Sequence, residues 1–98
     1  MQIKIHRSHR NVVAIADTEI IGKKFEQGLL QLDVRENFYK DKEVSKEELI
    51  KLIQFHKRDD ATFNIVGKES CQTAIEAGLI SKEAIGKVQN IPFALTLL

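Results

Sequence analysis

The sequence predicts an α+β fold in which helices pack on a small mixed β-sheet, in the approximate order ββαβαβαβ. Residues 61–67, ATFNIVG, hold only Thr62 and Asn64 as polar interruptions, which is typical of a strand covered on both faces. Strand and helix patterns alternate only in the later part of the chain, which indicates a mixed sheet. A chain of 98 residues, 43% hydrophobic and 30% charged, has the size and composition of one globular domain over residues 1–98.

The first two elements form a predicted antiparallel hairpin. Residues 2–6 alternate polar and apolar side chains, with Ile3 and Ile5 on one face, and residues 11–16, NVVAIA, are a second β-like run. The polar connection between them is short enough for a hairpin turn.

A short helix and a third strand are expected next. Asp17 occupies an N-cap position before residues 18–24, where Gly22 weakens the helical pattern. Gly28 closes the turn that follows. Residues 30–34 then alternate in the manner of a strand half covered by the core.

The strongest helix signal covers residues 46–57. Ser45 and Glu48 form a predicted capping box, in which the serine hydroxyl accepts the Glu48 amide and the carboxylate returns to the Ser45 amide. Val44 and Leu49 flank the cap as a hydrophobic staple. An apolar stripe at helical spacing follows, so this helix needs a sheet to cover.

A second helix follows the central strand. Its buried face is expected to contain Cys71, Ala74 and Ile75. Gly78 is a predicted left-handed terminator, after which Leu79 folds back onto Ala74 in a Schellman motif.

The last part of the chain is expected to be a short helix and then an extended segment. Ser81 is placed as the cap of a helix over residues 82–85, which Gly86 ends. From Val88 the pattern is extended. Pro92 makes the final segment either an edge strand or a strand that begins at the proline.

Composition excludes several classes of protein. The sequence has no apolar run of membrane-spanning length and begins without a signal peptide, so we expect a cytoplasmic protein with no membrane insertion. Its single cysteine can form no intramolecular disulfide and excludes thiolate zinc sites. A formal net charge of +1 leaves any affinity for nucleic acid to local clusters of basic residues.

The junction between the central strand and the second helix is a candidate anion site, formed by Asn64, Gly67 and Lys68. A glycine that joins a buried strand to a helix exposes amides to an anion. A P-loop would need a glycine in place of Thr62 and a serine or threonine in place of Glu69, and both are missing. A tight turn is the simpler interpretation of Gly67.

The sequence predicts no catalytic residue, no metal site and no cofactor. His6, His9 and His56 are too few and too scattered for a ligand set, and His56 has the spacing of a neutral core histidine. Cys71 lies on a buried helical face, where a thiol behaves as a small apolar group.

Basic residues at two places support our first functional hypothesis, a non-catalytic module that binds RNA or a ribonucleoprotein. Arg7 and Arg10 lie at the predicted hairpin tip, and Lys23 and Lys24 follow the same hairpin. No aromatic side chains accompany them for base stacking. A solvated turn is the ordinary alternative.

A protein–protein adaptor is the second hypothesis, and a small enzyme or ligand-binding protein with an anion or nucleotide at Gly67 is the third. Residues 35–43 are predicted to be a loop held to the body by Phe38 and Tyr39. This aromatic pair and an edge strand within residues 93–98 would contact the protein partner. Oligomeric state and strand order stay open.

The blocks NVVAIADTEIIGKKFEQGLLQLDV, ENFY, NIVGKESCQTAIEAGLI and IPFALTLL resemble, over nearly the whole chain, the archaeal domain-of-unknown-function 424 family (DUF424). The resemblance is carried by Asp17, Gly22, Gly28, Leu32, Phe38, Tyr39, Asn64, Val66, Gly67, Gly78 and Pro92. Phe93 departs from the pattern, which has histidine there, so this chain could not use a catalytic group at that position. The resemblance implies an uncharacterised protein of archaeal type with an apparent link to translation, and it supplies no substrate or cofactor.

Overall fold

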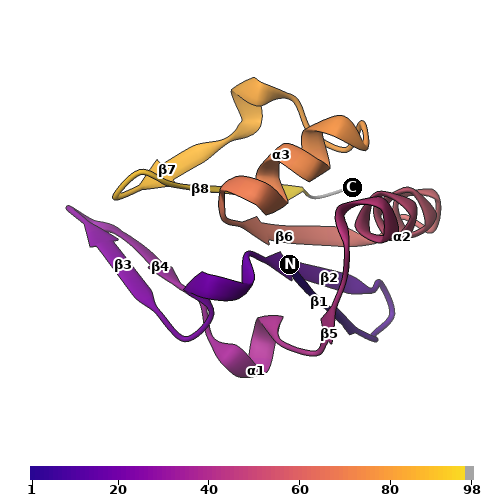
Figure 1. The fold of residues 1–98 in the computed structure, drawn as a ribbon, viewed down its shortest axis with the longest axis horizontal. Helices are drawn as coiled ribbons and strands as arrows, with labels where there is room; N and C mark the ends of the chain where they lie inside the picture. Colours follow the sequence, from indigo (N-terminus) through magenta and orange to yellow (C-terminus); the bar gives the residue numbers. More distant parts are fainter. Residues whose placement is uncertain (97–98) are drawn as a thin grey trace.

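The computed structural model describes residues 1–96, which fold into a layered α+β structure with a radius of gyration of 12.4 Å (Figure 1). The strands are β1 (Gln2–His6), β2 (Val12–Ala16), β3 (Lys24–Gln27), β4 (Leu30–Asp33), β5 (Lys42–Glu43), β6 (Thr62–Val66), β7 (Gly86–Val88) and β8 (Ile91–Thr96). The helices are η1 (Thr18–Ile20) and η2 (Lys82–Ala84), both of 3-10 type, and α1 (Glu36–Tyr39), α2 (Lys46–Arg58) and α3 (Lys68–Glu76). None of these helices is long and apolar enough to cross a membrane.

Six strands form one mixed sheet in the order β5-β1-β2-β6-β8-β7, and β3 pairs with β4 in a separate hairpin. The predicted hairpin of β1 and β2 is confirmed, with Gln2 opposite Ala16 and His6 opposite Val12. β2 and β6 run parallel, whereas the other neighbouring pairs of the sheet are antiparallel. The expected mixed sheet is therefore confirmed.

β6 is the central strand that the sequence predicts. β2 and β8 flank it, so both of its edges are hydrogen-bonded within the sheet. Phe63 and Ile65 are at most 1% exposed on one face, and Val66 is fully buried on the other. Because successive side chains alternate, Asn64 shares the face of Val66.

Two hydrophobic clusters lie on opposite faces of the sheet. Phe63, Ile65 and residues of β1 and β2 pack against α2 and α3, with Leu49, Ile53, Cys71 and Ala74 among the buried contacts. On the opposite face, Ala14, Ala16 and Val66 pack against η1, α1 and the segment that ends the β3–β4 hairpin. Figure 1 shows the two layers, with α2 and α3 on one side of the sheet and α1 with the hairpin on the other.

The segment after β2 differs from the predicted helix over residues 18–24. Only η1 forms, because Gly22 has a φ of +89° and its amide donates a hydrogen bond to the Val34 carbonyl at 2.7 Å. This bond and the return bond from the Val34 amide to the Lys23 carbonyl turn the chain into β3. β3 was not expected from the sequence, because Phe25 is the only apolar residue among its four positions. β4 is a strand as expected, but it pairs only with β3.

Residues 35–43 are more regular than the predicted loop, since they contain α1 and β5. The aromatic pair nevertheless holds this segment to the sheet as expected. Tyr39 is 8% exposed, and the Phe38 ring stacks on His6 with centroids 4.5 Å apart. His6 Nε2 also lies 2.8 Å from the Phe38 carbonyl oxygen.

The ends of α2 and α3 largely follow their sequence signals. The Glu48 amide donates to Ser45 Oγ at 3.2 Å, but the Glu48 carboxylate lies 2.9 Å from Lys42 Nζ and does not complete the capping box. At the end of α3, Gly78 has a φ of +79° and the Leu79 amide donates to the Ala74 carbonyl at 3.0 Å. The predicted Schellman motif is therefore confirmed.

The last part of the chain forms η2 and a second hairpin of the main sheet. Ser81 makes no side-chain cap bond, and η2 ends at Ala84. β8 lies between β6 and β7, so it is an internal strand and not the expected edge. β7 has only three residues, so it pairs with β8 from Ile91 to Phe93, next to the tight turn at Gln89 and Asn90. Of the proposed contact segment over residues 93–98, Leu97 and Leu98 lie outside the described residues.

Candidate anion-binding pocket

The junction of β6 and α3 is closed by a carboxylate of the chain itself. Gly67 has a φ of +110°, and α3 begins at the next residue. Asp17, 4% exposed, accepts hydrogen bonds from the Glu69 amide at 3.1 Å and from the Ser70 amide at 2.8 Å. The Ser70 hydroxyl donates to the same carboxylate at 2.7 Å. Asp17 was expected to cap the helix after β2; it caps α3 instead, and it makes no side-chain cap bond to η1.

The residues of the predicted anion site are separated by the sheet. Gly67 lies against Asp17, and Asn64 lies on the face of the sheet opposite to α3, because it alternates with Phe63 and Ile65. Lys68 alone of the three predicted residues reaches a pocket beside α3. The surroundings of Lys68 therefore define the candidate site.

This pocket, which we call the α3–β7 pocket, has a volume of about 430 Å³. It lies between α3 and the segment that contains η2, β7 and the β7–β8 turn. Its lining residues are Lys68, Cys71, Gln72, Ile75, Lys82, Ile85, Lys87, Asn90 and Pro92. Its volume falls within the range of about 300–1,000 Å³ that is usual for small-molecule sites.

The lining divides into an apolar floor and a basic rim. Cys71 and Pro92 are buried, and Ile75 and Ile85 are half-buried, so together they form the floor. The rim carries the exposed side chains of Lys68, Lys82 and Lys87, together with the amides of Gln72 and Asn90. None of the lining residues is acidic.

The three lysines of the rim are not neutralised within the described part of the chain. No ion pair or hydrogen bond of residues 1–96 involves the side chain of Lys68, Lys82 or Lys87. Elsewhere on the surface, lysines such as Lys42 and Lys46 pair with carboxylates at 2.9 and 2.8 Å. The pocket therefore combines unpaired positive charge with apolar surface.

Local structure explains how the lysines reach the pocket. η2 places Lys82 on the rim, and β7 carries Lys87 opposite Pro92 of β8, next to the turn that contains Asn90. Gly86 lets the Phe93 ring approach the backbone, since a Cβ there would lie 2.8 Å from the ring atom Cζ. The sequence carries no signal for this assembly, because Lys82 and Lys87 look like ordinary surface lysines and α3 meets them only through the fold.

The thiol on the floor is not a nucleophile at neutral pH. Burial, with a smaller contribution from the Asp17 carboxylate, raises the pKa of Cys71 to about 12. The thiol therefore stays protonated over the physiological range. Among residues 1–96, no group of three or more His, Cys, Asp or Glu side chains is arranged to hold a metal ion.

The four basic residues proposed for RNA lie in two separate places. Arg7 and Arg10 lie before the start of β2. Lys23 and Lys24 lie after the end of β2, beyond η1, and Figure 1 shows the two ends of β2 on opposite sides of the molecule. Arg10 lines a small polar hollow together with Asp59 and Asp60. Lys24 Nζ lies 3.7 Å from the Glu26 carboxylate. The structure therefore does not join the four cations into one surface.

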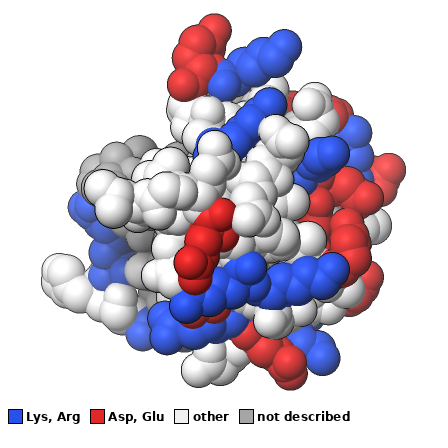
Figure 2. All heavy atoms as spheres, turned by 90° about the vertical axis from the view of Figure 1, so that its left-hand side faces the viewer, with Lys and Arg blue, Asp and Glu red and all other residues white. Residues whose placement is uncertain are grey.

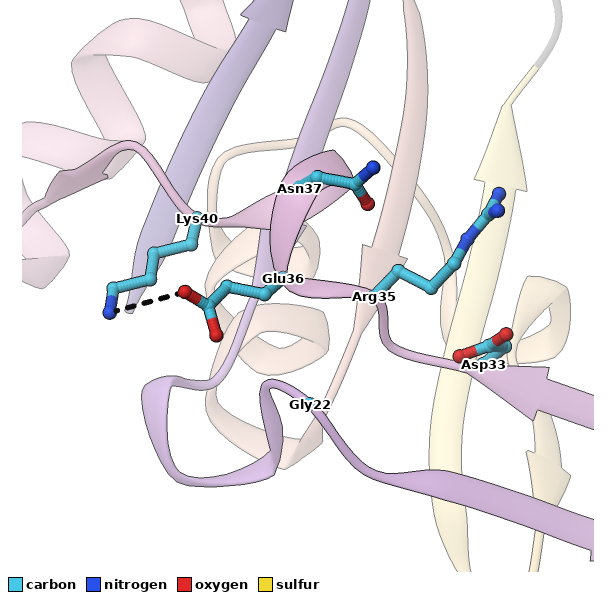
Figure 3. Close-up of a pocket in the computed structure, with 6 residues that line it drawn as sticks. All are labelled: Gly22, Asp33, Arg35, Glu36, Asn37 and Lys40. Carbon is cyan, nitrogen blue, oxygen red and sulfur yellow. Dashed lines mark ion pairs between the residues drawn. The ribbon is translucent and has the colours of Figure 1, made fainter.

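A second hollow beside α1 contains charges of both signs (Figure 3). It is lined by Gly22, Asp33, Arg35, Glu36, Asn37 and Lys40. Glu36 and Lys40 point toward each other at 3.8 Å, whereas Arg35 extends away from them. Because carboxylates and cations alternate there, this hollow has less net attraction for an anion than the α3–β7 pocket has.

The fold and the pocket define a small α+β domain with a candidate ligand site on one side of its sheet. Comparison with protein families shows that the chain belongs to the family described as protein of unknown function (DUF424), whose model matches residues 6–97.

One solved structure that resembles the chain is the crystal structure of an uncharacterized conserved protein from Methanopyrus kandleri. The two have a TM-score of 0.87 and 22% sequence identity, over 97% of this chain and 88% of that chain. This likeness shows the shared fold. No curated protein matches the chain.

Proposed function

We propose that the protein is a binding module and that its α3–β7 pocket takes a phosphate-bearing ligand. The observation that carries this proposal is the set of three unpaired lysines around an apolar floor without an acidic lining residue. Like charges held at one rim repel one another, and a bound anion removes that repulsion. Each charge-assisted hydrogen bond from an ammonium group to a phosphate contributes about 1.5–3 kcal/mol.

Single-stranded RNA carries the same chemistry, a phosphate beside a flat apolar base, and it extends the hypothesis drawn from the sequence. RNA or a ribonucleoprotein is thus one source of the proposed ligand, and a free phosphorylated metabolite is the other. The pocket lysines support either source, because three ammonium groups attract any phosphate. Arg7 with Arg10 and Lys23 with Lys24 would then be two further contacts along a longer strand.

The test replaces the three rim lysines with alanine in the full chain. We expect pyrophosphate to raise the melting temperature of the parent protein, and the K68A/K82A/K87A variant to bind it about a hundredfold more weakly. A matched control, K51A/K57A/R58A, removes the same charge from exposed side chains that line none of the pockets described above and belong to none of the proposed RNA contacts. Equal weakening in both triple variants, or no binding of pyrophosphate by the parent, would contradict the proposal.

The RNA source is tested by fluorescence anisotropy with a labelled, short, single-stranded uridine RNA at several salt concentrations. We expect affinity to fall steeply with salt and to be lost in K68A/K82A/K87A. The paired reversals R7E/R10E and K23E/K24E show whether either outlying pair touches the same strand. Unchanged RNA affinity in all three variants would exclude RNA as the ligand of this pocket.

A second candidate function, a protein–protein adaptor, is favoured by the tip of the β3–β4 hairpin. Leu29 is fully exposed and Leu30 is 54% exposed, although Gln89 of the β7–β8 turn hydrogen-bonds to Glu26 and Gln27 of the same hairpin, and Figure 1 shows the two hairpins side by side. Figure 2 shows the side of the molecule that carries this hairpin, where lysine and arginine side chains form a band with a broad, mostly uncharged area above it. Tyr39 is buried, so the Phe38–Tyr39 pair offers less apolar surface than the tip does.

Point substitutions test the adaptor function better than removal of the last strand, because β8 is hydrogen-bonded to the central strand and its loss would unfold the sheet. We expect L29S/L30S to abolish capture of a specific partner from cells, while the control F55S, at an exposed phenylalanine of α2, retains it. An unchanged set of partners in L29S/L30S would refute this function.

A further inference from the structure

We infer that the ligand of the α3–β7 pocket is a nucleoside monophosphate or diphosphate, with its base on the apolar floor and its phosphate at the three lysines. This inference rests on the proposed function and names the chemical class of the ligand. It follows from three features of the pocket: the size of the floor, the two amides on the rim, and the absence of carboxylates among the lining residues.

The floor offers more apolar contact surface than an inorganic anion would use. A phosphate ion would contact the ammonium groups of the rim and leave Ile75, Ile85 and Pro92 facing water. These side chains form apolar surface in a pocket of about 430 Å³, large enough to cover a flat ring as well as the phosphate. Burial of apolar area favours a ligand with an apolar part, at roughly 25 cal/mol for each Å² removed from water.

The amides of Gln72 and Asn90 add neutral hydrogen-bonding groups to the basic rim. The Asn90 side chain makes no hydrogen bond among the described residues, and the Gln72 Nε2 donates only to the exposed Glu76 carboxylate at 3.3 Å. Each side-chain amide offers both a donor and an acceptor. Such groups match the polar edge of a base or the hydroxyls of a ribose, which an alkyl phosphate lacks.

The charge of the pocket limits the number of phosphates. Mg²⁺ with a nucleoside triphosphate is usually held through one or two carboxylates, and no Asp or Glu lines this pocket. The three lysines themselves would neutralise the ligand. A phosphate monoester carries about −1.5 to −2 at neutral pH, so a monophosphate or diphosphate matches three ammonium groups.

The test compares ADP, AMP, adenosine and pyrophosphate by calorimetry, with the other nucleoside diphosphates as a second panel. We expect ADP or another nucleoside diphosphate to bind at least about tenfold more tightly than pyrophosphate. The Ile85→Ala variant should lose more affinity for ADP than for pyrophosphate, because the base and not the phosphate contacts this side chain. The Q72A/N90G variant should reduce discrimination among bases, since glycine keeps the positive φ of the turn at Asn90, which is +64°.

Each outcome separates the two proposals. If pyrophosphate and nucleotides bind equally, the nucleoside inference fails and the phosphate site stands. If neither binds, both fail. If nucleotides bind more tightly but Ile85→Ala and Q72A/N90G change nothing, the base lies elsewhere and the inference is overturned. Thermal melts of both variants without ligand ensure that lost binding is not lost folding.

A competition experiment distinguishes the two sources of a nucleoside phosphate. Free ADP is added to the protein bound to labelled single-stranded RNA. If ADP displaces the RNA at concentrations near the dissociation constant that calorimetry gives for ADP, both ligands bind in the pocket. The ligand with the higher affinity is then identified as the source. RNA that stays bound while ADP saturates the pocket overturns RNA as the source and leaves the free nucleotide.

Discussion

Gly67 and Asp17 constrain each other at the junction of β6 and α3. A Cβ on residue 67 would collide with the carboxyl group of Asp17, and the φ of +110° at Gly67 is one that residues with a side chain rarely adopt. The Asp17 carboxylate can cap α3 only because this space is empty. The glycine thus provides both the turn and the room for an internal cap from a residue distant in sequence.

We expect Gly67→Ala to lower the free energy of unfolding by about 3 kcal/mol or more, from backbone strain together with displacement of the cap. Gly78→Ala is the matched control, since Gly78 also has a positive φ, +79°, but a Cβ added there would meet no atom within 4 Å. Strain alone there should cost about 1 kcal/mol. Equal losses in the two variants, measured by urea denaturation, would show that the Asp17 contact is unimportant.

His56 is a second residue whose environment has a measurable consequence. It is 5% exposed, and its Nδ1 has no hydrogen-bond partner among the described residues. Burial lowers the pKa of His56 below its ordinary value of 6.5; Arg7 acts in the same direction and Asp59 opposes it. The folded protein therefore favours the neutral imidazole.

This shift makes stability depend on pH. Above pH 6.5 both the folded and the unfolded chain hold a neutral His56, so the residue imposes no penalty. As pH falls below that value, the unfolded chain takes up a proton that the folded chain does not, and the free energy of unfolding should decrease. We expect His56→Leu to flatten this decrease just below pH 6.5, and His9→Gln, at an exposed histidine, to leave it intact. Equal slopes in the two variants would contradict this role of His56.

At the scale of elements, the start of α2 shows that only the serine of the predicted capping box caps the helix. Ser45 Oγ accepts the Glu48 amide, whereas the Glu48 carboxylate pairs with Lys42 on β5. We expect Ser45→Ala to lower the free energy of unfolding by about 1 kcal/mol. Ser81→Ala is the matched control, because Ser81 precedes η2 without a side-chain cap bond. A loss as large in Ser81→Ala, measured by urea denaturation, would show that the hydroxyl of Ser45 is not acting as a cap.

Elements with strong local signals were predicted closely, and elements set by distant partners were not. α2 has a local cap and apolar periodicity, and α3 has apolar periodicity and a glycine terminator, so their positions could be predicted even though the cap at the start of α3 is the distant Asp17. β3 has a single apolar residue and forms because Gly22 and Val34 hydrogen-bond across the base of the hairpin. The expected helix over residues 18–24 was wrong for the same reason, since one turn of local propensity is weaker than these longer-range bonds.

At the scale of the whole molecule, the sheet order brings together residues that are far apart in sequence. β2 pairs in parallel with β6, which places Asp17, after β2, beside the start of α3. β8 pairs with β6 on the other side, and β7 follows outside it. Lys82 and Lys87 are thereby carried to the flank of α3, where Lys68 completes the rim of the pocket.

The sequence by itself determined the α+β class, the buried central strand, the first hairpin, both ends of α2 and the C-terminal end of α3. These features depend on periodicity, glycine conformation and capping, which act over a few neighbouring residues. Only the tertiary structure decided that Asp17 caps α3, that Arg7 and Arg10 lie apart from Lys23 and Lys24, and that three lysines surround one pocket. The reason is that strand order and register set these distances, and both depend on contacts among residues dozens of positions apart.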